Sequence, residues 1–346
     1  MIRPLLIAFF FLPVLAAAAP INAEVNPCSS CHSQGRSQPY TSMGQALETV
    51  EACRVLIDHP LLTARVGKYS YRIERKGDQS EYSVTDGVDT LTAPIRWAMG
   101  ASSSIGQTYI LEKDGALYES RVSFYRETKA LAPTLGSANS APASLNEALG
   151  RLMTQEDKLS CFGCHSTGAV SGHQFTPERI RPGVQCSHCH EGSESHLSTI
   201  LEFDEGAASA IPKSMGSGLA AEKISEFCGQ CHRTWADIVM LPNLGIGNVR
   251  FQPYRLAGSK CYDADDARIS CLACHDPHRE LVSETSTYDS KCQACHDGGK
   301  PGAKRCRVAK ANCASCHMPK VELPGAHYKF SDHRIRVVKP NEKYPE

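Results

Sequence analysis

The chain has 346 residues, which is enough for two domains or one extended domain. Its 37 basic and 37 acidic side chains balance, so the charge offers no basic footprint for nucleic acid and argues against that class of partner. The numbers of cysteines, 17, and of histidines, 14, are unusually high, and any proposed fold must account for them.

The first 23 residues have the pattern of a secretory signal peptide. A positive start at Arg3 precedes an apolar run from Leu5 to Ala19, and Ala23 offers a small residue for cleavage. The run is shorter than the roughly 20 apolar residues that a membrane span needs, and no second run is long enough. We therefore expect a secreted, periplasmic or extracellular protein with no membrane span.

Residues 24–60 form an N-terminal haem segment with one Cys-x-x-Cys-His motif, from Cys28 and Cys31 to His32. Two thiols three residues apart lie on one face of a helical turn, from which they can add to the two vinyl groups of one porphyrin while the histidine ligates its iron. Zinc ribbons, thioredoxin-like sites and structural disulfides also use paired cysteines, but none of them requires the histidine. The motif therefore predicts a covalently attached c-type haem.

Residues 61–135 contain no such motif and are predicted to be rich in β-structure. Apolar and polar residues alternate over Tyr69–Glu74, and strand-like runs recur at Tyr82–Val84, Gln107–Leu111 and Leu117–Tyr125. Turn residues such as Asp86 and Gly87 separate the runs. A small antiparallel sheet of four or five strands fits this pattern. We expect it to be a scaffold, because nothing in it has catalytic spacing.

Residues 136–154 are predicted to be a linker followed by a helix. The stretch up to Ser144 is rich in serine, alanine, proline and glycine. Ser144 and Glu147 have the spacing of a capping box, and Leu145, Leu149 and Leu152 fall on one helical face. This helix should lead into the next region.

Residues 155–346 are predicted to be a six-haem region of loops and short helices, one of them over Ala220–Phe227. The fold class expected for the chain is thus mixed, with a small antiparallel β domain beside a mainly α and loop region organised around stacked haems. Seven motifs predict seven c-type haems, whose faces supply much of the buried apolar surface. The six further motifs are Cys161, Cys164 and His165; Cys186, Cys189 and His190; Cys228, Cys231 and His232; Cys271, Cys274 and His275; Cys292, Cys295 and His296; and Cys313, Cys316 and His317.

Seven histidines lie outside the motifs, enough to give every iron a second axial ligand. An iron with two axial histidines has no free coordination position and suits an electron carrier, whereas an iron with one free axial position can bind a substrate. His188 lies inside an attachment motif, and its simplest interpretation is a surface residue. The six expected distal ligands are His59, His173, His196, His278, His327 and His333.

Three cysteines also lie outside the motifs. An oxidising compartment favours pairing, and Cys261 and Cys306 each precede a motif by a short interval, so we predict a disulfide between them. Cys53 would then be free, buried or intermolecular.

Four stretches resemble the cytochrome c554-type multihaem proteins, in a superfamily related to pentahaem nitrite reductase and hydroxylamine oxidoreductase. They are Cys161–His165, Cys186–His196, Cys271–His278 and Cys313–Lys320, and the resemblance covers roughly residues 155–335. It implies close-packed parallel and perpendicular haem pairs, mostly with two histidine ligands, and it implies that His196 and His278 serve neighbouring haems. The β-like segment is not part of this core. The lysine-ligated haem of the nitrite reductases is missing, so no enzymatic activity is carried over.

These observations favour an electron carrier with redox proteins as donor and acceptor. A multihaem oxidoreductase is the first alternative, with one open haem acting on a small nitrogen or sulfur species. A subunit of an extracellular filament, or a homo-oligomer, is the second.

Overall fold

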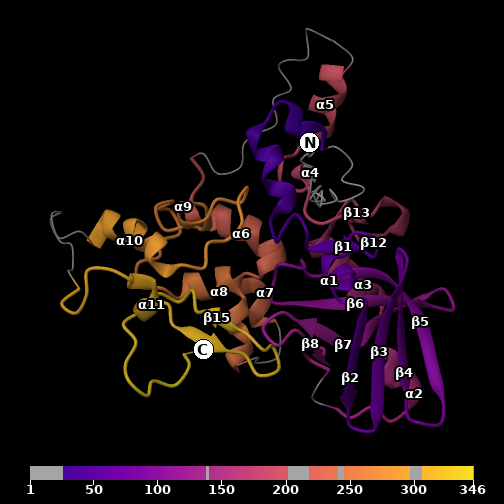
Figure 1. The fold of residues 1–346 in the computed structure, drawn as a ribbon. Coiled ribbons are helices and arrows are strands. Elements are labelled where there is room, and N and C mark those ends of the chain that lie inside the picture. The colour runs from indigo at the N-terminus through magenta and orange to yellow at the C-terminus, as the bar shows by residue number, and fades with distance from the viewer. Residues whose placement is uncertain (1–25, 138–139, 202–217, 241–244, 297–305, 346) are drawn as a thin grey trace, which may run out of the picture.

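The computed structural model describes residues 26–137, 140–201, 218–240, 245–296 and 306–345. A β-rich half, coloured indigo to magenta, lies beside a half of short helices and loops, coloured orange to yellow (Figure 1). Among the described residues, no helix is both long and apolar enough to cross a membrane. The expected signal peptide lies outside the described residues and stays a prediction.

The β-rich half is one antiparallel sheet of nine strands. Its main path runs in chain order from β2 to β8, while β1 pairs with β5 and β9 pairs with β7. The outer strands β2 and β8 also contact each other, so the sheet curls into a nearly closed barrel. The strands are β1 (Leu47–Thr49), β2 (Leu61–Val66), β3 (Tyr69–Lys76), β4 (Gln79–Thr85), β5 (Thr90–Met99), β6 (Gly106–Lys113), β7 (Ala116–Tyr125), β8 (Ala130–Pro133) and β9 (Gly150–Leu152).

The prediction of four or five strands was too low. The central strands β3, β4, β6 and β7 are where the sequence pattern placed them. The short strands β1 and β9 have three residues each and come from outside residues 61–135. A three-residue run carries too little alternation to be distinguished from a loop, so these strands depend on pairing with a neighbour.

The barrel interior is filled by alternate side chains of successive strands. Tyr71, Ile73, Tyr82, Val84 and Leu111 belong to one buried cluster. The short helices α1 (Arg54–Asp58) and α2 (Leu145–Leu149) add apolar side chains to the same cluster. Burial of this apolar surface is the main force that holds the β-rich half together.

The predicted helix after Ser144 is correct at its start and wrong in its length. The Ser144 hydroxyl accepts a hydrogen bond from the Glu147 amide, as the capping pattern requires. Helix α2 then stops at Leu149, because Gly150 begins β9 and crosses β7 so closely that a Cβ there would lie 2.4 Å from the Glu119 carbonyl oxygen. Leu152 therefore lies on an exposed strand instead of a helical face.

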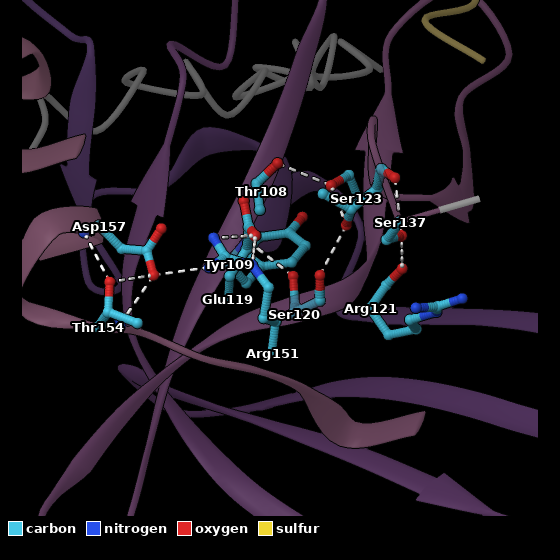
Figure 2. A network of polar contacts seen from close by, with 11 residues as sticks. Thr108, Tyr109, Glu119, Ser120, Arg121, Ser123, Ser137, Arg151, Thr154 and Asp157 are labelled. Atoms are coloured by element: carbon cyan, nitrogen blue, oxygen red, sulfur yellow. Dashed lines mark hydrogen bonds and ion pairs between the residues drawn. The ribbon is translucent and has the colours of Figure 1, made fainter. Parts of the chain in front are cut away.

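A polar network joins the sheet to the first helix that follows it, α3 (Gln155–His165) (Figure 2). Arg151 on β9 binds the Glu119 carboxylate on β7 at 2.9 Å and the Asp157 carboxylate on α3 at 2.6 Å. Thr154 and Asp157 form a complete capping box at the start of α3. This network fixes the direction in which α3 leaves the sheet.

Replacing Asp157 by asparagine should lower the free energy of unfolding at pH 7 by about 1 kcal/mol, the usual cost of a lost cap with a partly exposed ion pair. The hydrogen bond from Arg151 is the main reason why the pKa of Asp157 lies below its ordinary value. A depressed folded pKa gives stability above the unfolded pKa of about 3.9, and that stability is lost as the pH falls. Calorimetry at pH 7 and pH 3 should show a gap between D157N and the unchanged protein that narrows in acid. Asp114→Asn, at an exposed turn, is the control, and an equal gap at both pH values would contradict the assignment.

The other half consists of short helices joined by loops and two-stranded ladders. Ladders form between β10 (Ser166–Thr167) and β13 (Arg181–Pro182), β11 (Val170–Ser171) and β12 (Gln174–Phe175), and β14 (Lys320–Glu322) and β15 (Lys329–Ser331). The expected helix over 220–227 is confirmed and runs on to His232. The helices are α4 (Cys186–Cys189), α5 (Ser193–Leu201), α6 (Ala221–His232), α7 (Trp235–Val239), α8 (Gln252–Ala257), α9 (Cys271–Cys274), α10 (Asp289–His296) and α11 (Cys313–His317).

Candidate haem-binding sites

All seven Cys-x-x-Cys-His motifs lie on single helical turns. The first occupies a 3-10 turn, Pro27–Ser30, and the others lie within or at the end of α3, α4, α6, α9, α10 and α11. In the first, third and fifth motifs the histidine amide donates to the carbonyl of the first cysteine, with N···O distances of 2.8 to 2.9 Å. The two thiols of each motif therefore share one face, with the histidine directly after them.

Several motif histidines are oriented through their Nδ1 atoms. His165 Nδ1 lies 2.8 Å from the Ala46 carbonyl oxygen, just before β1. His317 Nδ1 lies 2.8 Å from the Arg336 carbonyl oxygen, and His232 Nδ1 lies 3.2 Å from Gln252 Oε1 on α8. An acceptor at Nδ1 fixes the tautomer and leaves Nε2 free to ligate a metal, which is the usual arrangement of ligating histidines.

Three pairs of histidine rings lie close together at similar centroid distances. The ring centroids are 6.5 Å apart for His32 and His196, 6.1 Å for His190 and His278, and 6.2 Å for His275 and His333. Two imidazoles that bind one metal from opposite sides, with bonds of about 2 Å, have centroids about 6 Å apart. The three pairs therefore have the separation that one iron between two histidines requires.

The composition of these pairs argues against accidental ring packing. Aromatic rings also prefer centroid distances within this range. Each of the three contacts, however, joins a motif histidine to one of the histidines expected as distal ligands. Among the described residues, the buried Nδ1 of His196 has no hydrogen-bond partner, which is costly unless a ligand or water meets it. The residues present thus fit a haem in each pair.

The electrostatics of the site suit neutral imidazole ligands. Burial, followed by the neighbouring His275, lowers the pKa of His333 to about 4. Burial is also the main cause of the lowered pKa values of His165, His232 and His275. Metal ligation requires the neutral ring, so these rings need not lose a proton at neutral pH before they bind.

Four histidines outside the motifs are placed elsewhere. His59 packs against Phe124 at 5.3 Å and lines a pocket of about 280 Å³ beside Arg54 and Arg126. His327 packs edge-on against Tyr125 at 4.7 Å. Within the described parts of the chain, neither these two nor the exposed His173 and the half-buried His188 has a ring contact with a motif histidine. The expected ligand roles of His59, His173 and His327 stay predictions, and His188, whose simplest interpretation was a surface residue, is half-buried.

Cysteines from different motifs lie next to each other. Cys164 Sγ lies 3.7 Å from the Gln230 carbonyl oxygen in the motif that ends α6. Hydrogen bonding with Cys231 is the main cause that lowers the pKa of Cys164 to about 7. The other adjacent pairs are Cys28 with Cys186, Cys228 with Cys271, and Cys292 with Cys313.

The last two motifs connect to the others through the loop before α10. The Tyr288 ring lies edge-on to His275 at a centroid distance of 5.5 Å. The next residue, Asp289, accepts hydrogen bonds from the amides of Asn312 and Cys313 at 2.6 and 2.8 Å. The sites of all seven motifs therefore form one connected set.

The predicted disulfide between Cys261 and Cys306 is wrong in this structure. Both cysteines are exposed and free. Cys53 is also free, and it is buried in the β-rich half, where its thiol donates to Gln107 Oε1 at 3.0 Å. Spacing along the chain could not settle the pairing, because a disulfide depends on the distance between the two Cα atoms in space.

Sequence reasoning missed the residues that orient the histidines. Gln252 and the Ala46 carbonyl carry no motif, and only the fold brings them to His232 and His165. The pair Arg255 and Asp332 was also missed, although Asp332 directly precedes His333. A charged residue beside a candidate ligand is a weak signal that could have drawn attention to it.

Known proteins match parts of this arrangement. The family described as cytochrome c554 and c-prime matches residues 119–191. This range includes the motifs that end at His165 and His190, and it begins within β7, whereas the β-rich segment was expected to lie outside the resemblance. No curated protein matches the chain.

Among solved structures, the outer cell wall cytochrome OcwA is similar at 14% identity and a TM-score of 0.48, over 89% of this chain and 78% of that one. The family match spans two attachment motifs, and seven such motifs lie on helical turns. Over residues 119–191 the chain is similar to the cytochrome c554 and c-prime family, and its seven attachment motifs have the pattern of a multihaem c-type cytochrome.

Proposed function

We propose that this cytochrome carries seven c-type haems and passes electrons between redox partner proteins outside the cytoplasm. The observation that carries the proposal is the set of three histidine pairs with ring centroids 6.1 to 6.5 Å apart. An iron held by two histidines has no free position for a substrate and is suited to electron transfer. When bound, each haem supplies an iron that cycles between Fe(III) and Fe(II).

The contacts between motifs support a continuous path. His196 lies on α5, after the third motif, and its ring lies near His32 of the first motif. His278 follows the fifth motif, and its ring lies near His190 of the third. Each haem site is thereby built from two parts of the chain, so neighbouring sites are held at fixed separations. The adjacent cysteines of different motifs support the same proposal. The role of the protein is to fix these distances and to keep water from the buried rings.

The β-rich half is proposed to hold the first haem sites in place. The Ala46 carbonyl before β1 orients His165, and the capping network of Thr154 and Asp157 sets the direction of α3. We further propose that residues 1–23 are cleaved as a signal peptide, which places the mature chain in a compartment where haems are attached and retained.

An oxidoreductase is the second candidate. Among the described residues, no second histidine ring contacts His165 or His232, although both are oriented by acceptors at Nδ1. A haem with a free position on one side would bind a small nitrogen or sulfur species. Of the proposed functions, the electron carrier has the more direct support, because it rests on ring pairs that are present.

Mass spectrometry and electron paramagnetic resonance on the purified holoprotein test both candidates. We expect seven haems per chain and low-spin ferric signals from at least the three paired sites. Carbon monoxide added to the reduced protein distinguishes the candidates: unchanged spectra favour the carrier, and a bound fraction with nitrite or hydroxylamine turnover favours the enzyme. Fewer than seven haems, or high-spin signals throughout, would contradict the proposal.

A further inference from the structure

A buried ion pair in the helical half joins α8 to the residue that follows β15. Arg255 on α8 donates from Nε and Nη2 to the two carboxylate oxygens of Asp332, at 2.8 and 3.0 Å. Arg336 donates to the same carboxylate at 2.6 Å, and the Arg334 amide donates at 3.1 Å. The side chains of Arg255 and Asp332 are 1% and 0% exposed. Among the described ion pairs, no other has both partners so fully buried.

Stability alone is a poor explanation for this pair. Removing two charges from water costs several kcal/mol for each ion, and apolar side chains of similar volume often stabilise a protein as well or better. A buried carboxylate with four donors does, however, hold the backbone around it in one geometry. The question is which groups that geometry positions.

The short segment from Asp332 to Arg336 contains one candidate haem ligand, His333, and contacts a second, His317 on α11, through Arg336. His333 follows Asp332 directly and faces His275, and its carbonyl accepts a hydrogen bond from Ser259 at 3.2 Å. The Arg336 carbonyl holds Nδ1 of His317, and the Arg336 amide donates to the His317 carbonyl at 3.1 Å. The segment therefore contacts the fifth motif through His333 and the seventh through Arg336.

We infer that Asp332 is a positioning residue shared by two haem sites, with Arg255 and Arg336 as its fixed partners. It aligns His333 as the distal ligand of the haem at Cys271 and Cys274, and it aligns His317 as the proximal ligand of the haem at Cys313 and Cys316. The inference rests on the proposed haem sites and adds the coupling of two of them through one carboxylate. Loss of the Asp332 charge would leave the two arginines uncompensated beside the segment that contacts His333 and His317, and added positive charge would disfavour the ferric state at both sites.

Two substitutions and a matched control test the inference. Asp332→Asn removes the charge, and Arg255→Lys keeps the charge but loses the paired donors. Arg75→Lys is the control, because Arg75 is a mostly buried arginine of the sheet that donates to the carbonyls of Val50 and Glu51 and contacts no haem motif. Each holoprotein is measured by electron paramagnetic resonance, potentiometric titration and thermal unfolding.

In D332N, two of the midpoint potentials should rise and one low-spin site should gain a high-spin fraction. R255K should show the high-spin fraction with little change in potential, and R75K should show neither. If D332N and R255K lower only the unfolding temperature, or if all the potentials shift together, the shared positioning role is wrong. The failure of this inference can be distinguished from the failure of the proposed function. The haem count and low-spin signals of the unchanged protein test the proposed function by themselves, before any variant is compared.

Discussion

Chain produced without haem attachment is expected to keep a folded β-rich half and to lose the structure of residues 218–345. Both clusters of buried apolar side chains draw all their members from residues 47–180. Beyond residue 180 the buried apolar residues are few and scattered, for example Ile224, Val249 and Leu256. Ordering a residue costs about 1.5 kcal/mol, and only buried apolar surface, at about 25 cal/mol per Å², offsets this cost.

Limited proteolysis and hydrogen exchange of haem-free chain from a host without the attachment machinery check this prediction. Peptides from β3 to β7 should stay protected, and peptides from α6 to α11 should exchange at the rate of an unfolded chain. The holoprotein, treated in the same way, is the control and should be protected in both halves. Protection of α6 to α11 without haem would show that the protein core, and not the porphyrins, holds that half together.

The sequence predicted the chemistry of the sites better than their geometry. A Cys-x-x-Cys-His motif needs only one helical turn, so local sequence is enough to identify it, and all seven motifs lie on such turns. The strands β3, β4, β6 and β7 were found for the same reason, because alternation within one strand is local. Strands β1 and β9 were missed, since three residues carry no pattern without their partners β5 and β7.

Distal ligands are the opposite case, because each depends on contacts between distant parts of the chain. His196, His278 and His333 face motif histidines, whereas His59 and His327 pack against aromatic rings of the β-rich half. Nothing in the residues around a histidine distinguishes the two outcomes. The acceptors that fix the rings, such as Gln252 and the Ala46 carbonyl, are set by the fold and were equally hidden in the sequence.

Replacing His278 by alanine should alter the haem at Cys186 and Cys189, and not the haem of its own motif. His278 lies three residues after His275, but its ring faces His190 at 6.1 Å with an interplanar angle of 11°. Asp276 holds it there through Nδ1 at 3.2 Å. Loss of the ring should convert one low-spin site to high-spin and shift its potential by on the order of 0.1 V, within the about 0.8 V that axial ligands cover.

A double-mutant design identifies which haem responds. In a chain with Cys186 and Cys189 replaced by alanine, H278A should add no further high-spin signal, because the haem that it serves is absent. Leu281→Ala is the matched control, since Leu281 is exposed three residues after His278 and carries no group that ligates iron, and it should leave every signal unchanged. If the effect of H278A persists without the Cys186 haem, His278 serves the haem next to it in the chain. In that case His278 would not connect the fifth motif to the third, and this link in the proposed continuous path would be absent.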